Sequence, residues 1–173
     1  MKLFSADFHL GHKVIVPKYR DFISIEEHDN LIFDQMAKLK KRDILYIVGD
    51  LLFDSEHYDN YIETLSKMSC RIKLIMGNHD SMKLYKETRL PKLEIQLPLF
   101  SHKNYWISHC PIHPQELRNR YGNIHGHLHQ AQLNDDRYFE VGLDQNNNQF
   151  VDFDYIQETF KKKGLLTVVK KSN

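Results

Sequence analysis

The sequence is short of the residues on which several classes of protein depend. Its 173 residues include two cysteines, Cys70 and Cys110, too few for a disulfide framework or a Cys-x-x-Cys zinc site. No run of 18 apolar residues is present, and the apolar stretch after Met1 is too short for the core of a signal peptide. We therefore expect a soluble, unsecreted protein of the reducing cytoplasm, with no membrane partner.

An excess of charge of one sign is also absent. The chain has 24 lysines and arginines against 23 aspartates and glutamates, which does not favour nucleic acid as the main partner but does not exclude it. The basic residues at 161–163, 170 and 171 are typical of a solvated helix end. The length suits one hydrophobic core, so we expect a single domain over residues 1–173, in an oligomeric state that the sequence leaves open.

Apolar runs and amphipathic segments alternate through the first half of the chain. The patterns predict strands at residues 2–6, 44–48 and 71–76, and helices at residues 25–40 and 55–68. Ser24 and Glu27 form a capping box at the start of the first helix. Helices between strands indicate a parallel sheet, in which ligands bind beyond the carboxyl ends of the strands.

The pattern in the second half of the chain predicts a sheet of more mixed or antiparallel kind. After a short helix at residues 82–88, short links separate predicted strands at residues 93–97, 104–108, 121–125, 138–141 and 149–151. Residues 145–149 form a polar loop, a helix at residues 155–163 ends at Gly164, and residues 165–169 are expected to add an edge strand. Periodicity by itself indicates an α/β protein.

Residues with metal-ligand chemistry follow several of these strands. Seven of the eleven histidines fall between residues 79 and 129. Any one short polar segment is as typical of a turn or a helix cap as of a site. Several such segments in one chain favour a site with many ligands. The segments are Asp7-Phe8-His9, Gly49-Asp50, Gly77-Asn78-His79-Asp80, Ser108-His109 and Gly126-His127-Leu128-His129.

In this order and spacing, the five segments resemble the calcineurin-like metallophosphoesterase superfamily. The resemblance runs from Asp7 to His129 and toward Asp144, and implies a four-layer α/β/β/α sandwich of two facing mixed sheets flanked by helices. It also implies two divalent transition metals and a hydroxide between them as nucleophile. Manganese or iron suits the mixed oxygen and imidazole ligands, with zinc, cobalt or nickel as alternatives. By resemblance, one metal is held by Asp7, His9 and His129, the other by Asn78, His109 and His127, and Asp50 bridges both.

The same resemblance implies that His79 faces the substrate and protonates the leaving oxygen, with Asp80 as the partner that fixes its tautomer. His12 is expected near the substrate, His125 near the metal ligands and Asp144 behind a ligand imidazole. An ordinary loop or structural residue is the alternative interpretation of each. We expect Cys110 to be a small buried residue that is not a ligand, and three other histidines to lie at the surface: His28, His57 and His102.

The branches of the superfamily point to different substrates. The Asp-Arg-Gly triplet of its protein phosphatases is missing, because Asp50 is followed by Leu51 and Leu52. The opening from Asp7 to His12 instead resembles the Asp-x-His-x-Gly-His of compact bacterial, archaeal and phage-type phosphoesterases. We therefore expect a phosphodiesterase that acts on small, nucleotide-like diesters.

Three alternatives stay open beside the phosphodiesterase. A small-molecule phosphomonoesterase uses the same metal chemistry. A nuclease would require a basic track beside the cleft, which the balanced composition does not favour. A binding scaffold with a degraded centre is disfavoured because no expected ligand is replaced.

Overall fold

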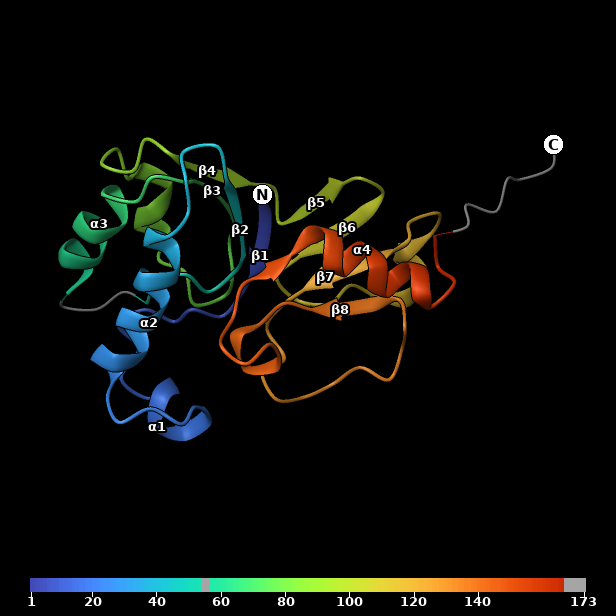
Figure 1. Cartoon of the computed structure of the whole chain (residues 1–173), viewed down its shortest axis with the longest axis horizontal. Coiled ribbons are helices and arrows are strands. Elements are labelled where there is room, and N and C mark those ends of the chain that lie inside the picture. Colours follow the sequence, from blue (N-terminus) through green and yellow to red (C-terminus); the bar gives the residue numbers. More distant parts are fainter. Residues whose placement is uncertain (54–56, 167–173) are drawn as a thin grey trace.

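The molecule is an α/β protein built on two β-sheets. A computed structural model describes residues 1–53 and 57–166 of the chain. Figure 1 shows the first sheet beside helices α2 (Ile25–Ala37) and α3 (Tyr58–Ser66), and the second sheet beside α4 (Phe153–Lys162). Each sheet contains both parallel and antiparallel pairs, so the predicted α/β fold with two mixed sheets is confirmed.

The first sheet has the strand order β4-β3-β2-β1-β9. Strands β1 to β4 run parallel, and β9 pairs antiparallel with β1. The carboxyl ends of β1, β2 and β3 therefore lie along one rim. The strands are β1 (Lys2–Ser5), β2 (Ile44–Val48), β3 (Arg71–Ile75), β4 (Leu93–Gln96) and β9 (Val151–Asp152).

The second sheet has the order β5-β6-β7-β8. Its strands are β5 (Leu99–His102), β6 (Tyr105–Ser108), β7 (Gly122–His125) and β8 (Tyr138–Glu140). A two-residue turn joins β5 to β6, and both turn residues, Lys103 and Asn104, have positive φ, as a tight hairpin requires. Strands β6, β7 and β8 run parallel, so their carboxyl ends also share a rim.

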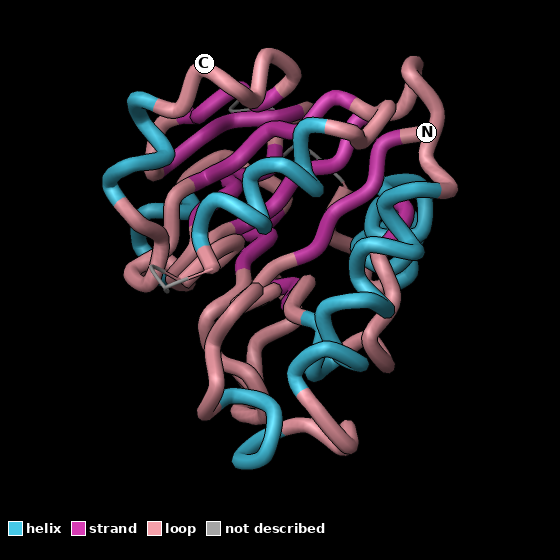
Figure 2. Tube along the Cα trace, turned by 90° about the vertical axis from the view of Figure 1, so that its left-hand side faces the viewer, coloured by secondary structure: helices cyan, strands magenta, loops and turns pink. Residues whose placement is uncertain are grey.

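Short helical elements and loops connect the strands. Figure 2 shows the loops gathered beyond one end of the strands. Among the described residues, no helix has the length and apolar character that a membrane crossing needs. The short elements are α1 (Ile15–Tyr19), η1 (Met82–Lys86), η2 (Pro114–Leu117) and η3 (Leu143–Gln145).

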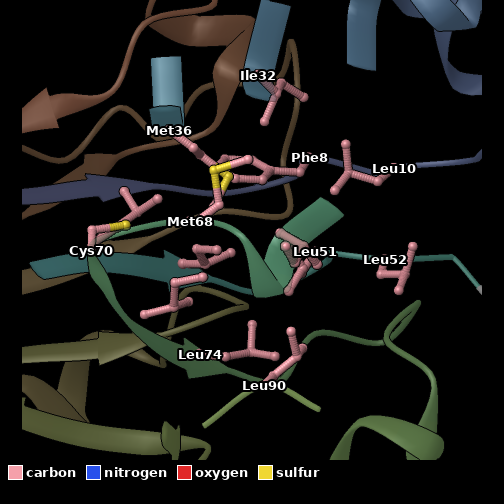
Figure 3. Packing of buried hydrophobic residues seen from close by; sticks show 14 of the residues in the cluster. Phe8, Leu10, Ile32, Met36, Leu51, Leu52, Met68, Cys70, Leu74 and Leu90 are labelled. Atoms are coloured by element: carbon pink, nitrogen blue, oxygen red, sulfur yellow. The ribbon is translucent and has the colours of Figure 1, made fainter. Parts of the chain in front are cut away.

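Two apolar clusters cover the two faces of the first sheet. Successive residues of β1 enter opposite clusters, because side chains alternate along a strand. Leu3 joins the cluster under α2 and α3, which includes Met36 and Ile62 and is partly shown in Figure 3. Phe4 joins the cluster that the first sheet shares with α4 and the second sheet. Burial on both faces explains why β2 is a continuous apolar run in the sequence.

Most predicted elements of the first half are confirmed. β2 has the predicted bounds, and α2 begins after Ser24, whose hydroxyl accepts a hydrogen bond from the Glu27 amide at 3.2 Å. α2 ends at Ala37 instead of residue 40. α3 begins at Tyr58, and the predicted start at residue 55 lies outside the described residues.

The assignment of strands to sheets differs from the prediction. β4 and β9 belong to the first sheet, although their position in the sequence placed them in the second. The hairpin strand β5 and the short helix α1 were not predicted. Leu165 and Leu166 lie in a turn and do not start a strand, and the rest of the predicted edge strand, residues 167–169, lies outside the described residues.

The aromatic contacts of Phe4 give a test of the packing between the sheets. Its ring is fully buried, stacks on Tyr46 at 4.5 Å between centroids and lies 5.3 Å from Phe153. Replacing Phe4 with alanine should lower the free energy of unfolding by about 3–5 kcal/mol, because a large cavity replaces these contacts. Urea unfolding followed by circular dichroism measures the change. Ile23, which is 96% exposed, is the control, and Ile23→Ala should change stability by less than about 0.5 kcal/mol. Equal effects at the two positions would contradict the packing described.

Candidate metal centre

The polar segments singled out in the sequence meet where the two rims of strand ends come together. Asp7, Asp50 and Asn78 follow β1, β2 and β3, while His109 follows β6 and His127 follows β7. Backbone hydrogen bonds tie these segments side by side, from the Asp7 amide to the Gly49 carbonyl and from the Gly126 amide to the His109 carbonyl, both 3.0 Å. Parallel pairing thus brings residues that are far apart in the sequence to one place.

The side-chain oxygens and nitrogens of this group face one another. Oδ2 of Asp50 lies 3.5 Å from Nε2 of His9 and 3.3 Å from Nε2 of His109, so one carboxylate oxygen faces two imidazoles. Nε2 of His109 is also 3.0 Å from Oδ1 of Asn78. Ligand atoms around a single ion, each ~2.0–2.2 Å from it, lie about 3–3.5 Å apart. The observed spacings therefore fit atoms that share metal ions.

The described residues contain two overlapping sets of acidic and histidine ligand atoms that lie within 4.8 Å of one another, Asp7/His9/His129 and Asp7/Asp50/His109. Both ring nitrogens of His9 are buried and make no hydrogen bond within the described part of the chain. Burying a polar atom without a partner is costly, and a metal ion would supply that partner. The donor sets thus fit two divalent metals with a carboxylate between them.

The ring of His109 is oriented by the backbone. Its Nδ1 lies 2.9 Å from the Val48 carbonyl, which can only accept, so Nδ1 carries the proton and Nε2 is left as a ligand atom. Gly49, with φ +92°, lets the ring lie against the backbone, since a Cβ at this position would lie 2.0 Å from Nδ1. The glycine of the Gly49-Asp50 segment is therefore required by the neighbouring histidine.

Asp144 holds His129 from behind. Its Oδ2 lies 2.8 Å from Nδ1 of His129, and its two oxygens accept hydrogen bonds from Nε and Nη2 of Arg20, each at 3.0 Å. The hydrogen bond that His129 donates to Asp144 raises the pKa of His129. Burial opposes ionisation of Asp144, but His129 and Arg20 together hold the pKa of its carboxyl well below the usual range. The structure thus places Asp144 where we expected it from the sequence, against the imidazole of a predicted metal ligand, His129.

Arg20 is a residue of the site that the sequence did not reveal. Besides Asp144, its guanidinium donates to the carbonyl of Asp7 at 2.5 Å and contacts the ring of His28. Nδ1 of His28 lies 2.7 Å from Asp29, and both residues are buried, so the expectation that His28 lies at the surface is wrong. An arginine outside any periodic pattern gives no local signal of such a role.

Asp80 does not bond to the His79 ring. Its Oδ1 accepts hydrogen bonds from the amides of Leu51 and Leu52, and its Oδ2 from those of Asp50 and Gly77, at 2.7–3.1 Å. A carboxylate has about four lone-pair sites for hydrogen bonds, and these four amides occupy them. Asp80 therefore holds together the segments that follow β2 and β3. The prediction that it is the hydrogen-bond partner of the His79 ring is wrong. Burial raises its pKa to about 6.

His79 and His12 line an open cleft next to the ligand atoms. The His79 side chain is exposed, and its backbone amide donates to Oδ1 of Asp50 at 2.9 Å. Nδ1 of His12 accepts hydrogen bonds from the amides of Val14 and Ile15, so Nε2 carries the proton of the neutral ring. The cleft has a volume of about 340 Å³ and is lined by His9, His12, Val14, Ile15, Lys18, Tyr19, Asp50, His79, His127 and His129.

The backbone at the centre is unusual. Five of the seven predicted ligands have positive φ, a region that costs non-glycine residues on the order of 1–3 kcal/mol each. Such conformations persist where surrounding contacts impose them, and they cluster at functional sites. The five are Asp7 (60°), His9 (49°), Asp50 (55°), His127 (77°) and His129 (53°).

Other predicted residues lie elsewhere. His125 is buried at the end of β7, 3.0 Å from Glu140, and lines a separate pocket of about 260 Å³ instead of the cleft. His102 is half-buried and not at the surface, whereas His57 is exposed as expected. Cys110 is exposed, so the expectation of a buried thiol is wrong.

Burial and mutual contact change the pKa values of the predicted ligands in the metal-free protein. Burial raises the pKa of Asp7 to about 7 and lowers that of His9 to about 3. For Asp50 and His109, burial opposes the charged forms, but their hydrogen bond and charges prevail. These contacts lower the pKa of Asp50 to about 2 and raise that of His109 to about 9. Without metal, a positive imidazole thus compensates the central carboxylate.

Comparisons with known proteins agree with this geometry. Residues 3–170 match the family model described as calcineurin-like phosphoesterase. The uncharacterized protein MJ1445 of Methanocaldococcus jannaschii is 28% identical over 133 residues, covering 75% of this chain and 70% of that protein. The crystal structure of AQ665 from Aquifex aeolicus, a protein of unknown function, superposes with a TM-score of 0.70 at 23% identity, covering 91% of this chain and 98% of that one.

The charge pair of Asp50 and His109 predicts how the stability of the metal-free protein depends on pH. The raised pKa of His109 means that its contribution is complete below its ordinary value of about 6.5 and is lost as the pH rises through about 9. The melting temperature of chelator-treated protein should therefore fall between pH 6.5 and pH 9. Asp50→Asn removes the charged partner and should flatten this decline. If the melting temperature of Asp50→Asn fell as steeply with pH as that of the parent, the proposed pairing of Asp50 with His109 would be contradicted.

Proposed function

The chain belongs to the calcineurin-like phosphoesterase family, and on this basis we propose that it is a metal-dependent hydrolase of small, nucleotide-like phosphodiesters. The observation that carries the proposal is the set of facing carboxylate and imidazole atoms, most of them buried, at the open cleft. Such a set has the composition of a two-metal hydrolytic site.

The metal-binding residues divide into two groups around Asp50. Asp7, His9 and His129 would hold one ion and Asn78, His109 and His127 the other. When bound, two divalent metals supply a hydroxide at neutral pH and neutralise charge on the phosphoryl oxygens. Manganese and iron are our preferred ions for this mixture of oxygen and nitrogen donors.

The side chains of the cleft would position the substrate and supply a proton. His12 presents an Nε2–H group, since its Nδ1 is used by two backbone amides, and this group can donate to a phosphoryl oxygen. His79 has an exposed ring 5.2 Å from that of His9 and would protonate the departing alkoxide. The ring of Tyr19 stacks on that of His129 at 5.7 Å and has Nζ of Lys18 4.9 Å from its centroid, so these three side chains form one wall of the cleft.

The charge of the cleft favours a diester over a monoester. Among the described residues that line it, Lys18 alone carries a permanent positive charge. A diester has one negative charge, whereas a monoester dianion would gain from a second cation such as a bidentate arginine. A small-molecule phosphomonoesterase is the second candidate, because the ligand set would serve it equally.

We predict that His79→Ala lowers kcat for substrates with a poor leaving group by on the order of 10²–10⁴, because a general acid is lost. The loss should be smaller for nitrophenyl esters, whose leaving group needs no proton. Metal content, measured by elemental analysis, should stay at two ions per chain. Asp50→Ala is the matched variant, and it should lose both metal and activity. Full activity of His79→Ala on an alkoxide leaving group would remove its assigned role.

We further predict that kcat/KM is higher for bis-nitrophenyl phosphate than for nitrophenyl phosphate at one metal loading. The same order should hold for 2′,3′-cyclic nucleotides against 5′-mononucleotides. Lys18→Ala should raise KM for diesters with little change in kcat, because the lysine binds the same charge in substrate and transition state. A monoester preference in both pairs would replace the diesterase by the phosphatase and leave the metal assignment intact.

A further inference from the structure

Cys110 is an exposed residue beside two of the proposed metal ligands, His109 and His127. The sulfur of Cys110 and ligand nitrogens of His109 and His127 all lie within 4.8 Å of one another. The two imidazole rings are 5.0 Å apart and nearly perpendicular, and the cysteine is exposed. A thiol and two imidazoles are the donor types of common zinc sites. This arrangement includes a residue that the expected ligand set does not use.

Buried hydrogen bonds fix the turn that carries Cys110. The Ser108 hydroxyl donates to the Cys110 carbonyl at 2.6 Å and accepts from Nδ2 of Asn123 at 3.1 Å. Asn123 is fully buried, and its Oδ1 accepts from the amide of Ile112 at 3.0 Å, so it holds the chain on both sides of the cysteine. Pro111 further restricts the backbone of Cys110 to extended conformations. The backbone that carries the thiol therefore has a defined position next to the imidazoles.

We propose that Cys110 is an additional ligand of the metal ion held by His109 and His127, and that it biases this position toward thiophilic ions. On binding, the thiol releases its proton to solvent and the thiolate coordinates the ion. Thiolates favour zinc and cobalt(II) over manganese, which prefers carboxylate and carbonyl oxygens. The inference rests on the proposed two-metal centre and adds a preference between its two positions, since the Asp7, His9 and His129 group has no sulfur among its members.

Cobalt(II) titration of the purified protein tests this ligand directly, since thiolate coordination to cobalt gives an intense near-ultraviolet charge-transfer band. The experiment uses metal-free protein, a phosphine reductant without thiols, and elemental analysis to count bound ions. The parent should show the band, and Cys110→Ser should bind cobalt without it. Cys70→Ala is the matched control, because Cys70 is the second cysteine of the chain and lies buried in the core, and it should keep the band.

Competition between zinc and manganese gives a second measurement. Cys110→Ser should reduce the preference for zinc by on the order of 10–100-fold, the range found when a group that supports a metal is removed. Two bound cobalt ions without a charge-transfer band in the parent would overturn the role of Cys110 and leave the metal centre intact. A band that survives in Cys110→Ser would also overturn it. A parent that binds no cobalt, zinc or manganese would overturn the metal centre itself, and the inference with it.

Discussion

Buried charges bonded to the backbone hold the proposed metal-binding side chains in place. The carboxylate of Asp80 receives four amides from the ends of β2 and β3, and Arg20 holds both Asp144 and the carbonyl of Asp7. These charged groups are buried, so losing a partner would leave an uncompensated charge inside the protein. The loops after the parallel strands are thereby kept in the one arrangement in which the ligand atoms face each other.

Local patterns in the sequence predicted what depends on neighbouring residues. The apolar run of β2, the Ser24 cap of α2 and the stop at Gly164, whose φ is +74°, are all written in adjacent residues. The order of the polar segments indicated the family, and the family implied which residues share a site. Two mixed sheets followed from the same resemblance, while periodicity by itself gave only an α/β protein.

Features that depend on distant contacts were not predictable in this way. β4 and β9 join the first sheet because of where the chain crosses over, and strand periodicity carries no information on which sheet a strand enters. Asp80 stands next to His79 in the sequence, yet its partners are amides 28 to 30 residues earlier and that of Gly77. The positive φ angles of five proposed ligands could not be predicted either, because aspartates and histidines occur throughout the sequence and their backbone conformation has no local sequence signal.

The two rims of strand ends, one from β1 to β3 and the other from β6 to β8, are synthesised at different times because they come from different halves of the chain. Four of the seven proposed ligands, Asp7, His9, Asp50 and Asn78, belong to the first 78 residues, whereas His109, His127 and His129 follow strands of the second sheet. A nascent chain that ends after β4 therefore still lacks three of the seven proposed ligands, and it also lacks β9, the last strand of the first sheet. The complete set of proposed ligands therefore comes together only when the two sheets pack against each other. Bound ions would then link residues from both halves of the chain and stabilise the completed fold, and they would play no part in starting its folding.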